Sequence, residues 1–239
     1  KKSIKTNTKA IIINHGSNVL GTIQNIEAIG ELSHSLGLLF IVDSAQTIGY
    51  VDIDVNKMHI DLLAFPGHKS LLGPQGTGGL YISKNITIQQ LKEGGTGSNS
   101  LLLTQPDFLP DKLESGTLNT PGIVGLNEGV NFIAQTGLKN IRKHEIELMR
   151  YLTEELKKIS NIKLYGETNC DVKTAVLSFN LDRFDSADVG ELLNQKDIYL
   201  RTSYHCAPLI HQIIGTKDIG TIRVSPGYFN TFEDIETFI

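Results

Sequence analysis

Two side chains of this sequence stand where a covalently bound cofactor could be held. Lys69 follows closely on the apolar run 61–65, and Asp43 closes the earlier apolar run 38–43. Continuous apolar runs of this length predict buried strands. A lysine and a carboxylate at the ends of buried strands suit a cofactor with an aldehyde at one end and a basic ring nitrogen at the other. Pyridoxal phosphate (PLP) is such a cofactor, because it needs a Schiff-base lysine and an acidic partner for its pyridinium nitrogen.

The apolar pattern of the first half predicts the elements that position these residues. Residues 9–15 and 38–42 are expected to be buried strands, and the apolar spacing over 23–36 predicts a helix between them, ended by Gly37. This order predicts a right-handed βαβ unit in a mostly parallel sheet. Ligands of such sheets bind at the carboxyl ends of the strands. The polar residues at these ends are Asn14, Asp43, Gln46, His68 and Lys69.

The second half of the sequence mixes helices with strands, as in an α/β fold. The Gly-rich run 73–79 lacks the ending of a P-loop and predicts a turn beside Lys69, and polar loops are expected between residues 85 and 120. The predicted strands are 162–166, 174–180, 198–201 and 221–225. The predicted helices are 121–136 with Thr120 as N-cap, 138–160, 186–195 with Ser186 as N-cap and Leu192 and Leu193 facing inward, and a last helix capped by Thr231.

The composition argues against several classes of function. The net charge of −4 at pH 7 provides no basic face for nucleic acid, and no apolar run approaches the roughly 20 residues that cross a bilayer. The sequence does not open with an apolar signal segment. Cys170 and Cys206 form no CxxC pair, which argues against a structural zinc site or a disulfide framework and favours the reducing cytoplasm. We expect Cys170 to be an inert surface thiol.

An ordered set of short segments carries a family resemblance. The segments are NVLGT (18–22), VDSAQ (42–46), AFPGHK (64–69), GPQGTG (73–78), ESGT (114–117) and RTSYHCA (201–207). Together they resemble the class V aminotransferase superfamily, and within it the cysteine desulfurases and selenocysteine lyases of the SUF-like group II. The resemblance runs from about residue 10 to the last residue.

The resemblance implies a fold and a domain division. It predicts a PLP-dependent transferase of fold type I, with residues 1–130 as the C-terminal part of the large PLP-binding domain. Residues 131–239 would form the smaller α+β C-terminal domain. Because the resemblance starts inside the family's large domain, we expect the chain to lack the N-terminal part of that domain. A sheet without those elements is expected to expose apolar edges and faces.

The resemblance also implies how the cofactor would be held. Lys69 would form the Schiff base, and its free amine would move the substrate's α-proton. Asp43 would hold the pyridinium proton, and Gln46 would bond to the phenolic oxygen of the ring. His68, counted among the catalytic residues, would contact the phosphate. Thr117 would reach the phosphate from the neighbouring subunit of a homodimer.

The remaining site residues would bind and attack the substrate. Asn18 resembles the residue near the substrate carboxylate, Arg223 would bind that carboxylate in a bidentate manner, and Arg201 sits near the same end. Cys206 would be the nucleophile that takes sulfur from L-cysteine, leaving alanine and a persulfide. A cationic Arg201 or His205 would raise the fraction of thiolate at Cys206.

Departures from the family pattern leave alternatives open. Pro66 replaces the usual Ser or Thr and has neither a hydroxyl nor a backbone N–H to offer the phosphate. Ser203 and Tyr204 replace the commoner Gly and His. The alternatives to a desulfurase are a selenocysteine lyase, a cysteine sulfinate desulfinase, and a truncated, inactive fragment without cofactor. A desulfurase would pass its sulfur to an acceptor protein, as in iron–sulfur cluster assembly.

Overall fold

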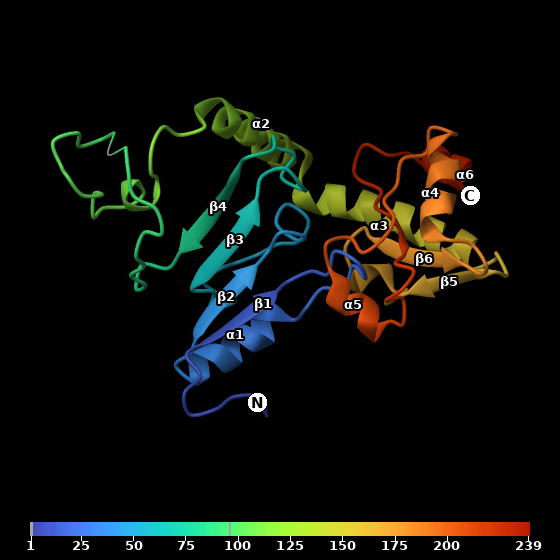
Figure 1. The fold of residues 1–239 in the computed structure, drawn as a ribbon, viewed down its shortest axis with the longest axis horizontal. Coiled ribbons are helices and arrows are strands. Elements are labelled where there is room, and N and C mark those ends of the chain that lie inside the picture. The colour runs from blue at the N-terminus through green and yellow to red at the C-terminus, as the bar shows by residue number, and fades with distance from the viewer. Residues whose placement is uncertain (1, 96) are drawn as a thin grey trace.

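The structure, a computed structural model, describes residues 2–95 and 97–239, so Thr96 in the predicted polar loops lies outside it. Two sheets lie apart and are joined by a long helix (Figure 1). The first sheet has the order β1-β2-β3-β4, with β1 at Ala10–Asn14, β2 at Leu39–Asp43, β3 at Leu62–Pro66 and β4 at Gly78–Ile82. Strands β1, β2 and β3 are parallel, and β4 is antiparallel to β3. The predicted mostly parallel sheet is therefore confirmed.

One face of this sheet is covered by helix α1 (Ile26–Ser35). Asn25 caps the helix, because its side chain accepts from the Ala28 N–H at 3.1 Å. The predicted stop at Gly37 is confirmed by a left-handed φ of 63°. The buried residues between helix and sheet are Ile26, Phe40, Val42, Ile60 and Leu63.

The opposite face of the first sheet is open to solvent. Ile12 is 72% exposed, and Leu39 and Leu80 are also exposed. The strand register places these three side chains on the same face, away from Phe40 and Val42. The expected exposure of apolar sheet surface is confirmed.

The second sheet is antiparallel throughout and has the order β5-β6-β7. Its strands are β5 at Ile162–Tyr165, β6 at Leu177–Leu181 and β7 at Ile222–Val224. Helix α3 (Leu138–Leu156) packs its apolar stripe against this sheet, and the shared core includes Leu148, Leu152, Leu177, Phe179 and Ile222. The shorter helices of this part are α4 (Ser186–Asn194), α5 (Pro208–Ile213) and α6 (Phe232–Phe238).

Helix α2 (Thr120–Thr136) lies beside the first sheet and leads into α3 at Gly137 (Figure 1). Its buried Ile133 shares a small core with Leu71 and with Ile141 of α3. Helix α3 therefore contacts both parts of the chain. Two single 3₁₀ turns are found at Asp111–Leu113 and Cys170–Val172.

Segment 17–23 follows β1 in sequence but is bound to the second sheet. The backbone N–H of Thr174 donates to the Gly21 carbonyl at 2.8 Å. The hydroxyl of Ser178 in β6 donates to the Val19 carbonyl at 2.6 Å. Val19 itself is fully buried. This segment connects the two parts of the chain at a second place besides α3.

Several local predictions differ from the structure at element ends. Asn119 caps α2 in place of Thr120, and Asp185 caps α4 in place of Ser186. The hydroxyl of the buried Ser186 instead donates to the Ile219 carbonyl at 2.8 Å. The predicted cap of the last helix is confirmed, because Thr231 forms a capping box with Asp234.

Other predictions fail because tertiary contacts outweigh the local pattern. Leu192 is exposed, whereas the helix prediction placed it inward. Cys170 is buried, so the expectation of a surface thiol is wrong. Of the predicted strand 198–201, the described residues pair only at Arg201. Helix α5 and strand β4 were missed, because proline and glycine open them.

Within residues 2–95 and 97–239, no helix combines the length and the apolar character needed to cross a membrane.

Candidate active site

A cavity of about 510 Å³ lies between the carboxyl edge of the first sheet and the second sheet. It contains side chains from distant parts of the sequence: loop 17–23, the turns after β2 and β3, the loop before α5, and β7. The predicted site residues that line it are Asn18, Gln46, Lys69, Arg201, Cys206 and Arg223.

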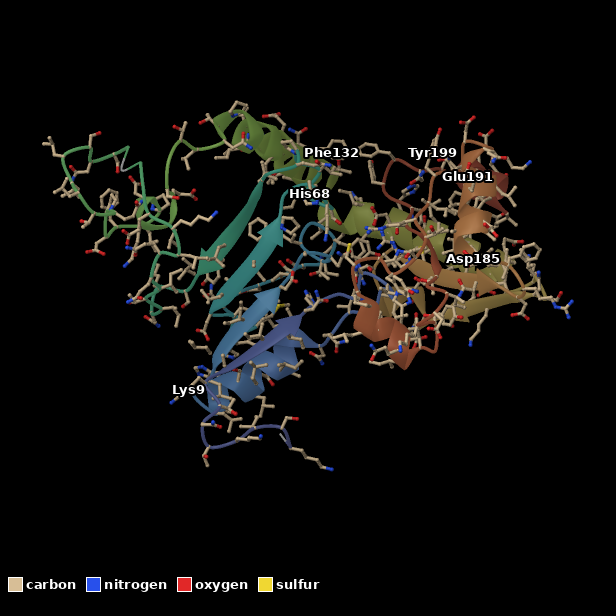
Figure 2. The ribbon with its side chains drawn as sticks, in the orientation of Figure 1. Lys9, His68, Phe132, Asp185, Glu191 and Tyr199 are labelled. Atoms are coloured by element: carbon tan, nitrogen blue, oxygen red, sulfur yellow. The ribbon has the colours of Figure 1, made fainter. Side chains whose placement is uncertain are left out.

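Three predicted site residues do not line this cavity. Asp43 ends β2 and accepts from the Ala45 N–H at 2.9 Å and from Asn14 Nδ2 at 3.2 Å. His68 is exposed beyond the tip of β3, on the side that faces the second sheet (Figure 2). Thr117 lies in the exposed loop before α2, and the structure does not bring it to the cavity.

The turn after β3 presents Lys69 to the cavity. Gly67 accepts from the Gly73 N–H and donates to the Thr77 carbonyl, both at 2.8 Å, so the predicted turn beside the lysine is confirmed. Desolvation lowers the pKa of Lys69. The negative charge of Asp43 opposes this shift, and the positive charge of Arg223 adds to it. Asp43 is therefore near enough to Lys69 for its charge to act on the amine.

Cys206 is exposed at the mouth of the cavity and has a guanidinium beside it. Arg201 Nη2 donates to Cys206 Sγ at 3.1 Å. His205 is buried, and burial lowers its pKa to about 4, so it is neutral at pH 7. The expectation that a cationic His205 promotes the thiolate is therefore wrong.

Two arginines lie side by side at the end of the cavity. The backbones of Arg201 and Arg223 bond to each other, with N···O distances of 3.3 and 2.7 Å. Burial, followed by the positive charge of Arg201, lowers the pKa of Arg223. Arg223 Nη1 donates to the Asn18 carbonyl at 2.8 Å, and its buried Nε has no partner among the described residues. An unpaired buried donor beside a second guanidinium suits an anionic ligand such as a carboxylate.

Sequence reasoning missed Glu145, which also lines the cavity. Burial raises the pKa of this carboxyl group from 4.5 to about 7, opposed by the Tyr228 backbone N–H and by the charge of Arg142. The sequence shows only that Glu145 interrupts the apolar stripe between Ile141 and Leu148 in α3, which does not by itself place the carboxyl group in a site. Among the described residues, no group of three or more His, Cys, Asp or Glu could hold a metal ion.

Comparisons with known proteins identify the family of the chain. The model of the family described as aminotransferase class-V matches residues 1–238. A probable cysteine desulfurase of Pyrococcus abyssi is 37% identical, with 100% of this chain and 60% of that protein covered. A probable cysteine desulfurase of Methanothermobacter thermautotrophicus is 34% identical, with 98% and 60% covered. The chain spans about 60% of the length of these curated relatives.

The chain is also similar to solved structures of cysteine desulfurases. The chain superimposes on the apo structure of a cysteine desulfurase from Thermococcus onnurineus with a TM-score of 0.91 and 34% identity, covering 96% of this chain and 58% of that one. The S-sulfonic acid form of a cysteine desulfurase from Escherichia coli gives a TM-score of 0.88 and 26% identity, covering 99% and 58%. With the family match extending over almost every residue, the chain belongs to the class-V aminotransferases.

Proposed function

We propose that this chain provides the site of a PLP-dependent cysteine desulfurase, which converts L-cysteine to L-alanine and leaves the sulfur as a persulfide on Cys206. The observation that carries the proposal is the geometry of one cavity. It combines an amine with a lowered pKa at Lys69, paired guanidinium groups at Arg201 and Arg223, and a thiol that accepts a hydrogen bond from Arg201.

The residues present suit the ring and aldehyde of PLP. Lys69 would bind the aldehyde, Asp43 would pair with the ring nitrogen, and Gln46 would bond to the phenolic oxygen. His68 would contact the phosphate, and Thr117 would do so from a second subunit. When bound, PLP supplies an electron sink for the substrate carbons. Pro66 has no polar hydrogen to offer the phosphate, so the affinity for the phosphate of PLP would depend on His68 and on Thr117 from the second subunit.

The chain's own residues would perform the rest of the reaction. Arg223 holds the substrate carboxylate, with Asn18 and Arg201 beside it. The neutral amine of Lys69 takes the proton from the α-carbon, since its lowered pKa keeps more of it unprotonated. The Cys206 thiolate then attacks the substrate sulfur, forming the S–S bond as the C–S bond breaks. The electron pair of the broken bond stays on the β-carbon, which takes up a proton, and the α-carbon regains the proton that Lys69 removed, which gives alanine.

The whole enzyme would work as a homodimer with a sulfur-acceptor protein. Loop 83–118 carries Thr117 together with exposed leucines, which is the composition of an interface segment. The persulfide on exposed Cys206 would pass to the acceptor, as in iron–sulfur cluster assembly. A reducing cytoplasm suits the free thiol that this transfer requires.

The test is spectroscopic and chemical. The purified 239-residue chain is titrated with PLP, and a visible absorbance band is expected that Lys69→Ala abolishes and the surface control Lys84→Ala retains. Cys206→Ala should keep the band and lose alanine and persulfide formation from L-cysteine. A Cys206→Ala variant that desulfurates cysteine at the full rate would overturn the proposal.

The same assay separates the alternatives. Activity on selenocysteine or cysteine sulfinate that survives Cys206→Ala favours a selenocysteine lyase or a sulfinate desulfinase. A chain that keeps its fold and never develops the absorbance band favours an inactive fragment without cofactor.

A further inference from the structure

The loop that carries Cys206 has an unusual backbone. Ser203, His205 and Cys206 have φ values of 80°, 51° and 62°. These values lie in the left-handed region that residues other than glycine seldom adopt. Gly220 lets the loop pass closely, because a Cβ added there would lie 2.7 Å from the Ser203 backbone. A backbone of this kind persists only where surrounding contacts hold it.

Contacts from Thr221, directly before β7, and from His211 of α5 hold the loop from one side. The buried ring of His205 bonds through Nε2 to the Thr221 hydroxyl at 2.9 Å. The Thr221 N–H donates to the Ser203 carbonyl at 3.0 Å. The buried ring of His211 bonds through Nε2 to the Tyr204 carbonyl at 3.2 Å. The three residues directly before Cys206 are therefore each held by a hydrogen bond.

The contact from the other side comes from Asn18. Its side-chain Nδ2 donates to the His205 carbonyl, and its own carbonyl accepts from Arg223 Nη1 at 2.8 Å. A carbonyl oxygen can only accept, so the nitrogen of the Asn18 amide must face His205. One residue thus joins the peptide unit before Cys206 to the guanidinium of Arg223.

Asn18 can serve this purpose because it is itself held firmly. It lies in a tight turn, in which the Gly21 N–H donates to the Ser17 carbonyl at 3.0 Å. The Ser17 hydroxyl accepts from the Leu20 N–H, also at 3.0 Å. The next residue, Val19, is fully buried, so the side chain of Asn18 is presented from a fixed point.

We propose that Asn18 is a positioning residue that holds the Cys206 sulfur at a fixed spacing from Arg223 and keeps it beside Arg201. A substrate bound through its carboxylate at Arg223 would then present its sulfur to a thiolate already in place, and such preorganisation favours the reaction. The inference rests on the proposed function for the role of Cys206 as the reacting thiol. The contacts themselves belong to the chain without cofactor, so they can be tested there.

The experiment compares the rates at which anionic iodoacetate and neutral iodoacetamide alkylate the cofactor-free chain at one pH, with mass spectrometry to assign the modified cysteine. Asn18→Leu removes the amide donor at nearly constant size and charge. We expect the ratio of the iodoacetate rate to the iodoacetamide rate at Cys206 to fall at least about threefold, because the sulfur leaves the guanidinium groups that attract the anionic reagent. Asn56→Leu, at an exposed asparagine of the first sheet region, should leave this ratio unchanged.

Cys170 is an internal control, because it is buried and reacts only if the fold loosens. A lowered ratio at Cys206 with Cys170 still unreactive supports the proposal, and an unchanged ratio overturns it. If Asn18→Leu also makes Cys170 reactive, the fold has loosened, and the same measurement is made on Asn18→Ser. The serine hydroxyl is too short to replace the amide as the donor to the His205 carbonyl. A chain that never binds PLP would defeat the proposed function and leave this result unaffected.

Discussion

The two basic neighbours of Cys206 differ in charge for a reason that lies outside their motif. His205 and Arg201 are close in sequence and were both expected to favour the thiolate. Burial keeps the pKa of His205 near 4, whereas the Arg201 guanidinium stays charged and bonds to the sulfur. That burial comes from Thr221 and His211, which only the folded chain brings to the loop. The residue type indicates that a histidine could be charged, and the tertiary contacts decide that His205 is neutral.

Pro66 allows a prediction of improved binding. It is the last residue of β3 and stands opposite Gly78 of β4. Pro66→Ser restores both a hydroxyl and a backbone N–H next to His68, and a hydrogen bond to a charged phosphate contributes about 1.5–3 kcal/mol. We expect Pro66→Ser to bind PLP at least about tenfold more tightly, measured by absorbance titration.

Pro66→Ala is the matched control, because it restores the N–H alone. Its affinity for PLP should lie between those of the parent chain and Pro66→Ser. Equal affinities for the alanine and serine variants would show that the hydroxyl does not reach the phosphate.

The candidate site could be predicted from the sequence where its residues lie in continuous motifs. Lys69, Gln46 and Cys206 stand in such motifs, and the structure brings them to one cavity. Glu145 could not be assigned to the site from the sequence, because its carboxylate reaches the cavity only when α3 packs against the loop that contains Tyr228.

Helix α3 carries a carboxyl group whose charge opposes folding. The folded chain binds the Glu145 proton more tightly than the unfolded chain, because its pKa is raised from 4.5 to about 7. The protonated carboxyl group therefore favours the folded state, and this stabilisation is fully present below pH 4.5 and is lost as the pH rises to about 7. A shift of this size corresponds to at most about 3 kcal/mol.

Glu145→Gln tests this contribution, since glutamine keeps an acceptor for the Tyr228 N–H and does not titrate. We expect the difference in unfolding free energy between the variant and the parent chain to change by up to about 3 kcal/mol between pH 4.5 and pH 8, in favour of the variant at the higher pH. Urea denaturation at several pH values measures it. Glu147→Gln, two residues further along the more accessible side of α3, should show little change, and an equal change there would contradict the assignment.

Among the helices and strands, the sequence predicts the long, periodic elements well and the short ones poorly. The apolar periods of α1 and α3 and the continuous runs of β1 and β2 predict their positions to within a few residues. Helix α5 has six residues and begins at a proline, so it carries no complete period. The run 198–201 has the composition of a strand, but only Arg201 pairs with β7, and residues 198–200 border a groove instead.

The molecule as a whole presents a long, mostly polar loop with exposed leucines away from both sheets. Loop 83–118 projects to one side, and its Leu91, Leu101 and Leu103 are almost fully exposed (Figure 1). Burying one leucine contributes about 1.5–3 kcal/mol, so an interface built on this loop should depend strongly on two of them. We expect Leu101→Ser combined with Leu103→Ser to weaken self-association at least about tenfold, measured by sedimentation velocity over a concentration series.

The control for this measurement is Ile213→Ser, which removes an exposed apolar side chain from α5 on the other part of the molecule. It should leave self-association unchanged. A parent chain that stays monomeric over the whole concentration series, or a control that dissociates as readily as the leucine variant, would contradict a homodimer formed through loop 83–118.

The binding of segment 17–23 to the second sheet affects how the chain could be recombined with a relative. The proposed division at residue 130 suggests that the C-terminal half can be exchanged as a block. In such a chimera Gly21 and Val19 would come from one protein, and the residues at positions 174 and 178 that bind them would come from the other. The turn that contains Asn18 would likewise lie beside an arginine at position 223 from the other protein. The unit of exchange is therefore discontinuous: a grafted second sheet has to bring its own version of residues 17–23 with it.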